Sequence, residues 1–342
     1  KTIGKPIGKP LFLDPNQCSE IKKTLIRIIQ EQYQAISTSE RLRNVTAKIL
    51  NKPGKAKSGL MKDKRLIILQ PFCTCTLEIL CRDRLEKICN MHIDNYLNQY
   101  GFTAKKGIQE ALFVHRRLLE CRKSMELDTY VLNLDVKKAF DKMSPKMIYP
   151  LLRKLGAPPT LVAAIKHLYE TRIMTFKNSN AKVQHTENRT LLMQGGSLGP
   201  TMYKCLKLGV MLSLKKEDVW TEWQFAAQPY KIINDLSHTL KKVTSTNYQW
   251  NNEITLYMIM FADDMQLYFD SRKQLEDGAP EFIKHLQRWG LHVHVATNKH
   301  GKSKSTVMYV QGMPNPAVGA TQPLKVPGGW IRFVEKYKFL GS

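Results

Sequence analysis

Apolar residues spaced three and four positions apart recur along several stretches of the chain, which is the pattern of helices that bury one face. In the first stretch, Pro15 follows an aspartate and gives a helix start signal ahead of Ile21, Leu25 and Ile28. The spacing predicts helices over 15–36, 77–97, 108–123, 137–156, 159–171, 201–216 and 273–289.

Shorter apolar runs predict strands. The run 66–69 follows a basic Gly/Pro loop, and 129–136 alternates between apolar and polar residues. Two further runs flank Asp263 and Asp264 as the arms of a tight hairpin. The remaining short strands are expected over 292–297, 305–310 and 330–334. The polar segment 217–251 predicts no element, and the mixture of helices and strands as a whole indicates an α+β fold.

The chain is long and apolar enough to build a core, and its charge is strongly positive. Of its 342 residues, 43% are hydrophobic, which excludes a chain that is disordered throughout. Lys and Arg total 53 against 29 Asp and Glu, a formal net charge of +24. Such an excess is typical of a protein that binds nucleic acid, although solvated surface lysines give the same balance.

The cysteines follow no disulfide framework, so we expect free thiols in an intracellular, reducing compartment. A zinc site made of Cys73, Cys75, Cys89 and His92 is an alternative, but its CxC start and long gaps match no usual ligand spacing. Core thiols on a helix are the preferred interpretation. No apolar run approaches the ~18 residues that a membrane span requires, and no membrane partner is expected.

Three carboxylates occur where predicted strands end. Asp135 closes the run 129–136, and Asp263 and Asp264 form the tip of the hairpin. If these strands pair in one sheet, the acids converge at its edge, where they repel one another unless a cation compensates them. Hard oxygen ligands of this kind suit Mg²⁺, and two such ions can activate a hydroxyl and neutralise a leaving phosphate. The alternative is an ordinary turn, because Asp favours turns.

Several motifs follow one another in order along the chain: LDVKKAFD, QGGSLGP, FADD, SKSTVMYV and YKFLGS. In this order they resemble the motifs of the reverse transcriptases, most closely those of non-LTR (LINE-like) retrotransposons. The resemblance covers residues 55 to 342 and implies a right-hand polymerase fold with fingers and palm subdomains. The activity it implies is RNA-directed DNA polymerisation, in which two Mg²⁺ ions help to add dNTPs to a primer on an RNA template.

The resemblance also implies roles for individual residues. Asp135 and Asp263 would be the shared metal ligands with Asp264 beside them, and all three are candidate metal-binding and catalytic residues. Lys304 would donate a proton to the leaving pyrophosphate. Phe140 would close off the space for a ribose 2′-hydroxyl. The candidate nucleotide-binding residues, which include the basic ones of KDKRLIIL, are Arg65, Lys62, Lys64, Phe140, Gln194 and Gly195.

The match has departures. Leu191, Gly196 and Gly199 replace the residues that are usual in the second motif. The chain ends at Ser342, just past a segment that resembles the primer grip, so we expect the thumb to be absent or truncated. The expected domains are a basic arm and helix over 1–54, fingers over 55–128, and a palm over 129–342 with a finger-like helical part at 142–190.

Some of these residues have plain structural alternatives. Phe140 could be a core aromatic residue, Gln194 an ordinary loop residue and Lys304 part of a solvated basic loop. His292 and His294 share a face but lack a third metal ligand. The tryptophans could stack on bases, but tryptophan side chains more commonly anchor the core or loops. They are Trp220, Trp223, Trp250, Trp289 and Trp330.

Two functions are open at this point. The first is an RNA-directed DNA polymerase with an RNA template, a DNA primer and dNTPs as partners, in the nucleus if the chain belongs to a retroelement. The second is a domesticated RNA-binding component of a ribonucleoprotein, such as a mitochondrial ribosome, with protein partners and no activity. The intact set of acids favours the first, because carboxylates near RNA phosphates repel them unless metal is bound.

Overall fold

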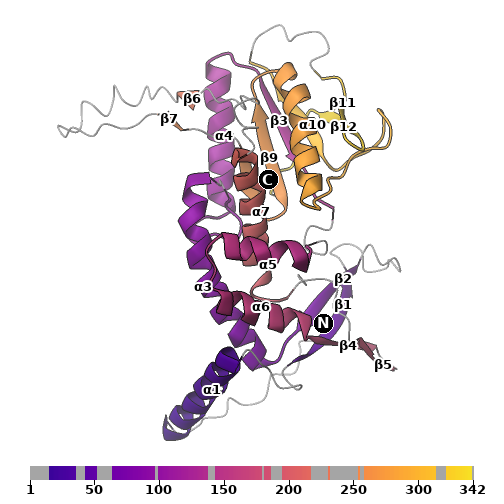
Figure 1. Cartoon of the computed structure of the whole chain (residues 1–342). Helices are drawn as coiled ribbons and strands as arrows, with labels where there is room; N and C mark the ends of the chain where they lie inside the picture. The colour runs from indigo at the N-terminus through magenta and orange to yellow at the C-terminus, as the bar shows by residue number, and fades with distance from the viewer. Residues whose placement is uncertain are drawn as a thin grey trace, which may run out of the picture. The chain divides into compact units, whose positions relative to one another are not determined.

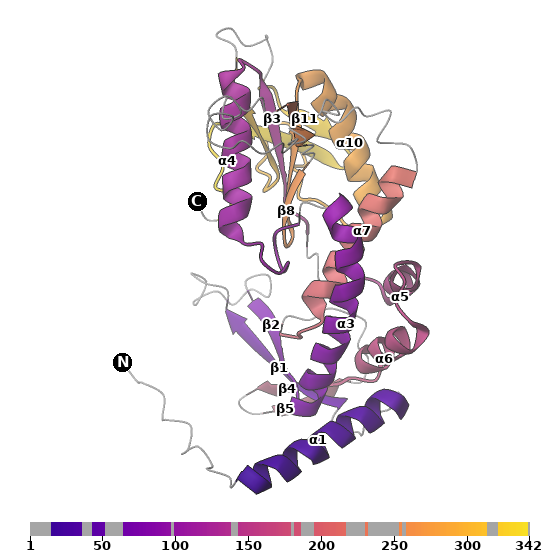
Figure 2. The ribbon, with the colours of Figure 1, turned by 90° about the vertical axis from the view of Figure 1, so that its left-hand side faces the viewer.

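The computed structural model divides into two compact units. One, the first unit, comprises Lys1–Arg84, Ala157–Arg189 and Met193–Leu198, and the second unit comprises Leu85–Gly156, Thr190–Leu192 and Gly199–Ser342. Figures 1 and 2 show their elements in two orientations. The structure describes residues 15–35, 43–51, 64–96, 99–137, 143–178, 181–185, 195–216, 230–231, 253–254, 258–312 and 321–340.

The second unit is built on a six-stranded sheet with the order β11-β12-β10-β3-β9-β8. Its strands are β3 (Thr129–Leu134), β8 (Met258–Phe261), β9 (Asp264–Phe269), β10 (Thr306–Val310), β11 (Leu324–Val326) and β12 (Gly329–Val334). All neighbours are antiparallel except β10 and β12, which run parallel. All residues of the central strand β3 are buried, which requires a covered sheet on both faces.

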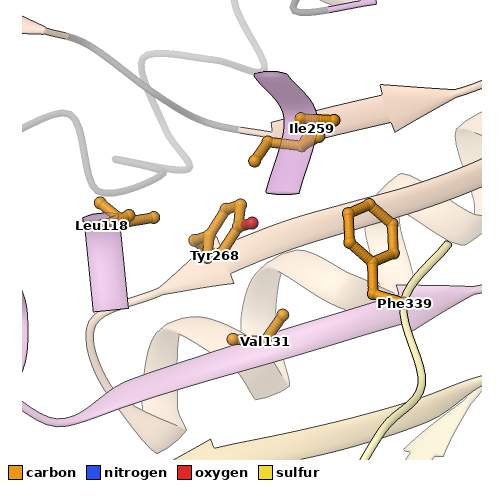
Figure 3. Packing of buried hydrophobic residues seen from close by; sticks show 6 residues of the cluster. Leu118, Val131, Ile259, Tyr268 and Phe339 are labelled. Carbon is orange, nitrogen blue, oxygen red and sulfur yellow. The ribbon is translucent and has the colours of Figure 1, made fainter. Parts of the chain in front are cut away.

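Two helices supply this cover, α4 (Ile108–Ser124) on one side of the sheet and α10 (Arg272–Arg288) on the other (Figures 1 and 2). On the α10 side, Tyr130 meets the edge of Phe333, and the guanidinium of Arg272 lies 5.1 Å from the Phe333 ring centroid. On the α4 side, a hydrophobic cluster (Figure 3) consists of Ala111, Leu118, Val131, Ile259, Tyr268 and Phe339.

The other elements of the second unit are two helices and a short ribbon. They are α5 (Pro145–Lys154), α7 (Gly199–Lys216), β6 (Tyr230–Lys231) and β7 (Glu253–Ile254). The long helix α3 (Phe72–Tyr96) starts in the first unit and ends in the second. Almost every described residue of α7 is buried, which explains its predominantly apolar sequence.

The first unit contains a four-stranded sheet with the order β2-β1-β4-β5. Its elements are α1 (Pro15–Ala35), β1 (Asn44–Asn51), β2 (Lys64–Leu69), α6 (Pro159–Glu170), β4 (Ile173–Asn178) and β5 (Ala181–His185). β1 pairs antiparallel with β2 and parallel with β4. Val45, Ile68 and Met174 form a small core on this sheet.

The α+β class is confirmed, and every predicted helix is present with shifted ends. The helix expected from residue 137 begins at Pro145, where proline suits the first helical position. The strand expected over 292–297 is wrong. That segment forms only isolated bridges, Val293 to Val136 and Ala296 to Trp330. Its main chain bonds first to the residues after β3 and then to β12, so it pairs with neither over a strand's length.

The strands β1, β4, β5 and β11 and the ribbon of β6 and β7 were not predicted, and β6 lies within the polar segment 217–251. In β1, the sequence NVTAKILN carries polar residues among its apolar ones, and its second half from Lys48 to Asn51 is exposed. Residues 44–49 nevertheless alternate between polar and apolar side chains, so the sequence does carry a strand signal here. None of the described helices is long and apolar enough to cross a membrane.

The cysteines that the structure describes carry free thiols. Cys89 and Cys205 are fully buried, and their sulfur atoms lie 2.7 Å apart. The ring of His92 lies 3.2 Å from the carbonyl oxygen of Leu155. Among the described residues, no three His, Cys, Asp or Glu side chains form a group that could hold a metal, so the zinc alternative gains no support.

Candidate active site

The hairpin of β8 and β9 carries two of the candidate acids. Phe261 pairs with Asp264, which leaves Ala262 and Asp263 as a two-residue turn. Ala262 has a φ of 53°, a left-handed conformation that is costly for a residue with a Cβ atom. Gly101 packs against this turn so closely that a Cβ atom on it would lie 2.4 Å from the Ala262 nitrogen.

The third acid comes to the same place through the pairing of β3 with β9. These strands are antiparallel, with Leu134 opposite Met265, so the next position along β3 sets Asp135 opposite Asp264. The pKa of Asp264 is raised to about 6, first by burial and then by the negative charges of Asp263 and Asp135. The acids expected to converge at one sheet edge therefore interact electrostatically, although among the described residues they do not form a three-residue group that could hold a metal ion.

Asp135 is held by its main chain as well as by its carboxylate. Its N–H group donates to the Ser305 hydroxyl at 3.1 Å, and its carbonyl accepts from the His294 N–H group at 2.8 Å. Its carboxylate oxygen Oδ2 lies 3.4 Å from His294 Nε2 and 3.7 Å from Lys304 Nζ. The predicted proton donor Lys304 is thus beside the predicted metal ligand.

His294 is a site residue that the sequence did not reveal. Its alternation with His292 indicated a shared surface face, but His292 is exposed whereas His294 contacts Asp135. The pKa of His294 is lowered by partial burial, against the pull of Asp135. The imidazole therefore tends to be neutral and offers a hydrogen-bonding group rather than a second fixed positive charge.

Lys207 of α7 lies beneath the hairpin. Its buried ammonium group donates a hydrogen bond to the carbonyl of Ala262 and lies 5.2 Å from the ring centroid of Tyr203. Burial lowers the pKa of Lys207 to about 7, although Asp263 and Asp264 oppose that shift. The only sequence signal for this role is a lysine in an otherwise apolar helical stretch.

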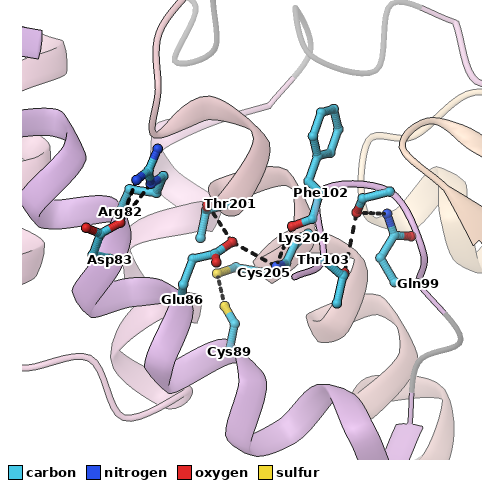
Figure 4. Close-up of polar contacts among 11 residues, drawn as sticks. Arg82, Asp83, Glu86, Cys89, Gln99, Phe102, Thr103, Thr201, Lys204 and Cys205 are labelled. Carbon is cyan, nitrogen blue, oxygen red and sulfur yellow. Dashed lines mark hydrogen bonds and ion pairs between the residues drawn. The ribbon is translucent and has the colours of Figure 1, made fainter. Parts of the chain in front are cut away.

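The segment 99–102, with the sequence QYGF, lies beside the hairpin. The Tyr100 N–H group donates to the Met260 carbonyl at 2.8 Å, and the Gln99 amide donates to the Gly101 carbonyl at 2.9 Å. On the other side of the segment, the Lys204 ammonium bonds to the Phe102 carbonyl at 3.0 Å (Figure 4).

Tyr337 comes from the segment that resembles the primer grip. Its pKa is raised to about 12, first by burial and then by the charges of Asp264 and Asp135. The phenol is therefore neutral at physiological pH and lies within the electrostatic field of the acids. Its place in YKFLGS was the only sequence signal for it.

The nucleotide-binding candidates are described only in part. Arg65 is exposed on β2, opposite Leu50, and the neighbouring Lys64 ammonium bonds to the Asn51 side chain. Gly195 forms a turn with a φ of 112°. The candidates that lie outside the described residues are Lys62, Phe140 and Gln194.

Only some of the tryptophans lie within the described residues. The indole of Trp289 donates to the Ser213 hydroxyl at 3.1 Å, a structural anchor. The Lys325 ammonium lies 6.0 Å from the ring centroid of Trp330. The others, Trp220, Trp223 and Trp250, lie outside the described residues.

Comparison with known proteins identifies relatives. The family model described as "Reverse transcriptase (RNA-dependent DNA polymerase)" matches residues 50–341. The retrovirus-related Pol polyprotein of the type-2 retrotransposable element R2DM from Drosophila melanogaster is 22% identical over 249 residues, which are 71% of this chain and 20% of that polyprotein. The chain therefore spans about a fifth of the length of this relative.

A solved structure shows the same fold. Apo telomerase from Candida tropicalis, truncated from its C-terminal domain, superposes with a TM-score of 0.51 at 13% sequence identity. The match covers 92% of this chain and 58% of the telomerase chain. Similarity at this level of identity concerns the fold alone, and it confirms the right-hand polymerase fold.

Proposed function

Because this chain belongs to the reverse transcriptase (RNA-dependent DNA polymerase) family, we propose that it is an RNA-directed DNA polymerase that extends a primer with dNTPs on an RNA template. One observation carries the proposal. The register of β3 and β9 sets Asp135 opposite Asp264, next to Asp263 in the hairpin turn. Polymerases concentrate carboxylates in this way for metal-dependent phosphoryl transfer.

The donors fit a divalent cation, and we propose Mg²⁺. Burial and then repulsion by Asp263 and Asp135 raise the pKa of Asp264, and a cation held by Asp135 and Asp263 would relieve that repulsion. Asp135 and Asp263 would supply carboxylate oxygens, and water and substrate phosphates would complete the shell, as Mg²⁺ prefers. Bound there, Mg²⁺ would activate the primer 3′-hydroxyl and neutralise charge on the leaving pyrophosphate.

Lys304 would supply the proton for the leaving group. Its side chain is 69% exposed while its ammonium lies 3.7 Å from Asp135, so the long side chain has room to turn toward a substrate. A positioned acid that protonates a leaving oxygen commonly contributes ~10²–10⁴-fold in rate.

The incoming nucleotide and the nucleic acid would be held by other groups. Arg65 and Lys62 would contact the triphosphate, Gln194 and Gly195 would line the base, and Phe140 would exclude a 2′-hydroxyl. The charge of +24 supports binding of the template and primer backbones. In this proposal residues 1–54 are a basic arm and helix, 55–128 are the fingers, and 129–342 are the palm with a finger-like helical part at 142–190.

Primer extension on an RNA template with Mg²⁺ and dNTPs tests the proposal. Asp263→Ala and Asp135→Asn should each lower the rate by at least ~10³-fold, because several kcal/mol of transition-state stabilisation would be lost. Asp277→Asn, an exposed aspartate of α10, is the matched control and should keep the native rate. Equal signals at background from the native chain and Asp263→Ala would overturn the proposal.

A binding-only role as a ribonucleoprotein component is not favoured. It would leave acids clustered at the sheet edge, where they repel RNA phosphates. Stoichiometric structural RNA that copurifies with the chain, together with no primer extension, would instead support that role.

A further inference from the structure

Four segments of the first unit meet at one buried carboxylate, that of Glu78 on α3. Its oxygen Oε1 accepts a hydrogen bond from Arg172 just before β4 at 2.5 Å, and another from Gln70 just after β2 at 2.7 Å. Its oxygen Oε2 accepts from the N–H group of Ser197 at 2.9 Å. Glu78 therefore joins α3, the end of β2, the start of β4 and the turn at 195–197.

Joining these four segments through a buried carboxylate carries a cost in folding free energy. The side chains of Glu78 and Arg172 are 0% and 2% exposed, and a buried ion pair often adds less stability than apolar residues of similar size. Among the described residues, Arg172 Nε and Gln70 Oε1 are buried without a hydrogen-bond partner, which adds a further penalty. Stability alone does not explain the junction, whose members surround the turn at 195–197.

The turn lies against β2 with no space between them. A Cβ atom on Gly195 would lie 2.6 Å from the carbonyl oxygen of Ile68, near the C-terminal end of β2. A Cβ atom on Gly196 would lie 3.1 Å from Glu78 Oε2. The strand and the carboxylate thus fix the turn from two sides, and β2 also carries Arg65.

We propose that Glu78 is a positioning residue that holds the 195–197 turn at a fixed distance from β2, and thereby sets how the chain binds a nucleoside triphosphate. Glu78 touches no substrate and acts through the turn. This inference rests on the proposed function, because it takes the turn and Arg65 as parts of one nucleotide site.

The proposal differs from a purely structural role in what a mild substitution should do. Glu78→Gln keeps the size of the side chain but cannot accept from all three donors. Gly196→Ala leaves the Glu78–Arg172 pair intact and pushes the turn away from Oε2 by a few tenths of an ångström. Both variants should weaken nucleotide binding, whereas a structural role predicts a loss of thermal stability alone.

The test is equilibrium binding of a fluorescent dNTP analogue to the full chain with a primer–template, in Ca²⁺ so that no chemistry occurs. Thermal unfolding is measured on the same samples. Arg122→Lys is the matched control, because Arg122 forms another buried ion pair, with Asp270 at 2.6 Å in the second unit. Steady-state extension then separates KM for dNTP from kcat.

We expect Glu78→Gln and Gly196→Ala to raise the nucleotide Kd and KM by roughly tenfold, the cost of one lost charge-assisted contact in the site. Their kcat should change much less, and Arg122→Lys should keep the native Kd. Unchanged Kd in Gly196→Ala, or an equal loss in Arg122→Lys, would overturn the inference. Native binding without extension would refute the polymerase function and leave the inference standing, whereas no binding by the native chain would refute the inference.

Discussion

Lys207 donates a hydrogen bond from its buried ammonium group to the main-chain carbonyl of Ala262, the left-handed residue of the hairpin turn. The contact joins α7 to the tip of β8 and β9. A neighbouring buried lysine, Lys204, makes the same kind of contact with the carbonyl of Phe102, which also has a positive φ. Two strained main-chain positions beside the acids are thus each held by a lysine of one helix.

Removal of the Lys207 charge should raise the pKa of Asp264. The positive charge of Lys207 opposes the burial and the like charges that bring this pKa to about 6. We expect Lys207→Met to raise it by up to about one unit, as measured by carboxyl NMR titration of the metal-free protein. Lys207→Arg keeps the charge and should titrate like the native chain, and equal titration of the Met and Arg variants would contradict this.

Asp264→Asn should stabilise the protein at alkaline pH and not at acid pH. The folded-state pKa of Asp264, about 6, lies above its ordinary value of 3.8, so the folded state favours the protonated form. The resulting stability is present below pH 3.8 and is lost as the pH rises through 6. Since the group is partly solvated, the variant should gain roughly 1 kcal/mol in free energy of unfolding at pH 8.

Urea unfolding at pH 8 and pH 4 measures this gain. Asp277→Asn, on the exposed face of α10, should show none at either pH. A gain of equal size at both pH values would mean that the effect does not arise from ionisation of Asp264.

The buried His115 should make the native protein sensitive to acid. Burial, with the nearby charge of Arg116, lowers the pKa of His115 from 6.5 to about 4. The unfolded chain therefore binds more protons between these values, and stability is lost as the pH falls from 6.5 toward 4. His115→Gln should lose less over this range, whereas the exposed control His292→Gln should follow the native curve in thermal unfolding.

Gly101→Ala should displace the carboxylate hairpin. Its Cβ atom would meet the Ala262 nitrogen at 2.4 Å, and main-chain atoms cannot yield as a flexible side chain can. We expect a loss of about 1–3 kcal/mol in free energy of unfolding and a fall in extension rate. In the control Gly107→Ala, the nearest atom is the mobile carboxylate end of Glu110, which can move aside. A native free energy of unfolding and extension rate in Gly101→Ala would refute the close packing.

The acids were predictable from sequence because their signals are local. Asp135 ends an apolar run, and Asp263 stands between two others, so short windows of sequence placed both. Lys207 and Glu78 were not predictable, because each is defined by partners far away in the chain. A buried lysine and a surface lysine look alike in sequence until the neighbouring elements are known.

The same reason accounts for the errors in the fold. The segment 292–297 has the composition of a strand, but its main-chain partners come from two separate elements, and it forms only bridges. Its residue His294 reaches Asp135 because the His294 N–H group bonds to the Asp135 carbonyl, next to the bridge between Val293 and Val136. Contacts of this kind depend on strand order, which local patterns do not encode.

The position of β3 in the middle of its sheet affects how the protein folds during its synthesis. Its partners β9 and β10 leave the ribosome more than about a hundred residues after it, on the order of ten seconds at ordinary rates of synthesis. Until then, a strand that the folded protein buries on both faces stays unpaired and prone to aggregate. Recombinant yield should therefore improve at low temperature and with extra chaperones, which protect nascent chains during that interval.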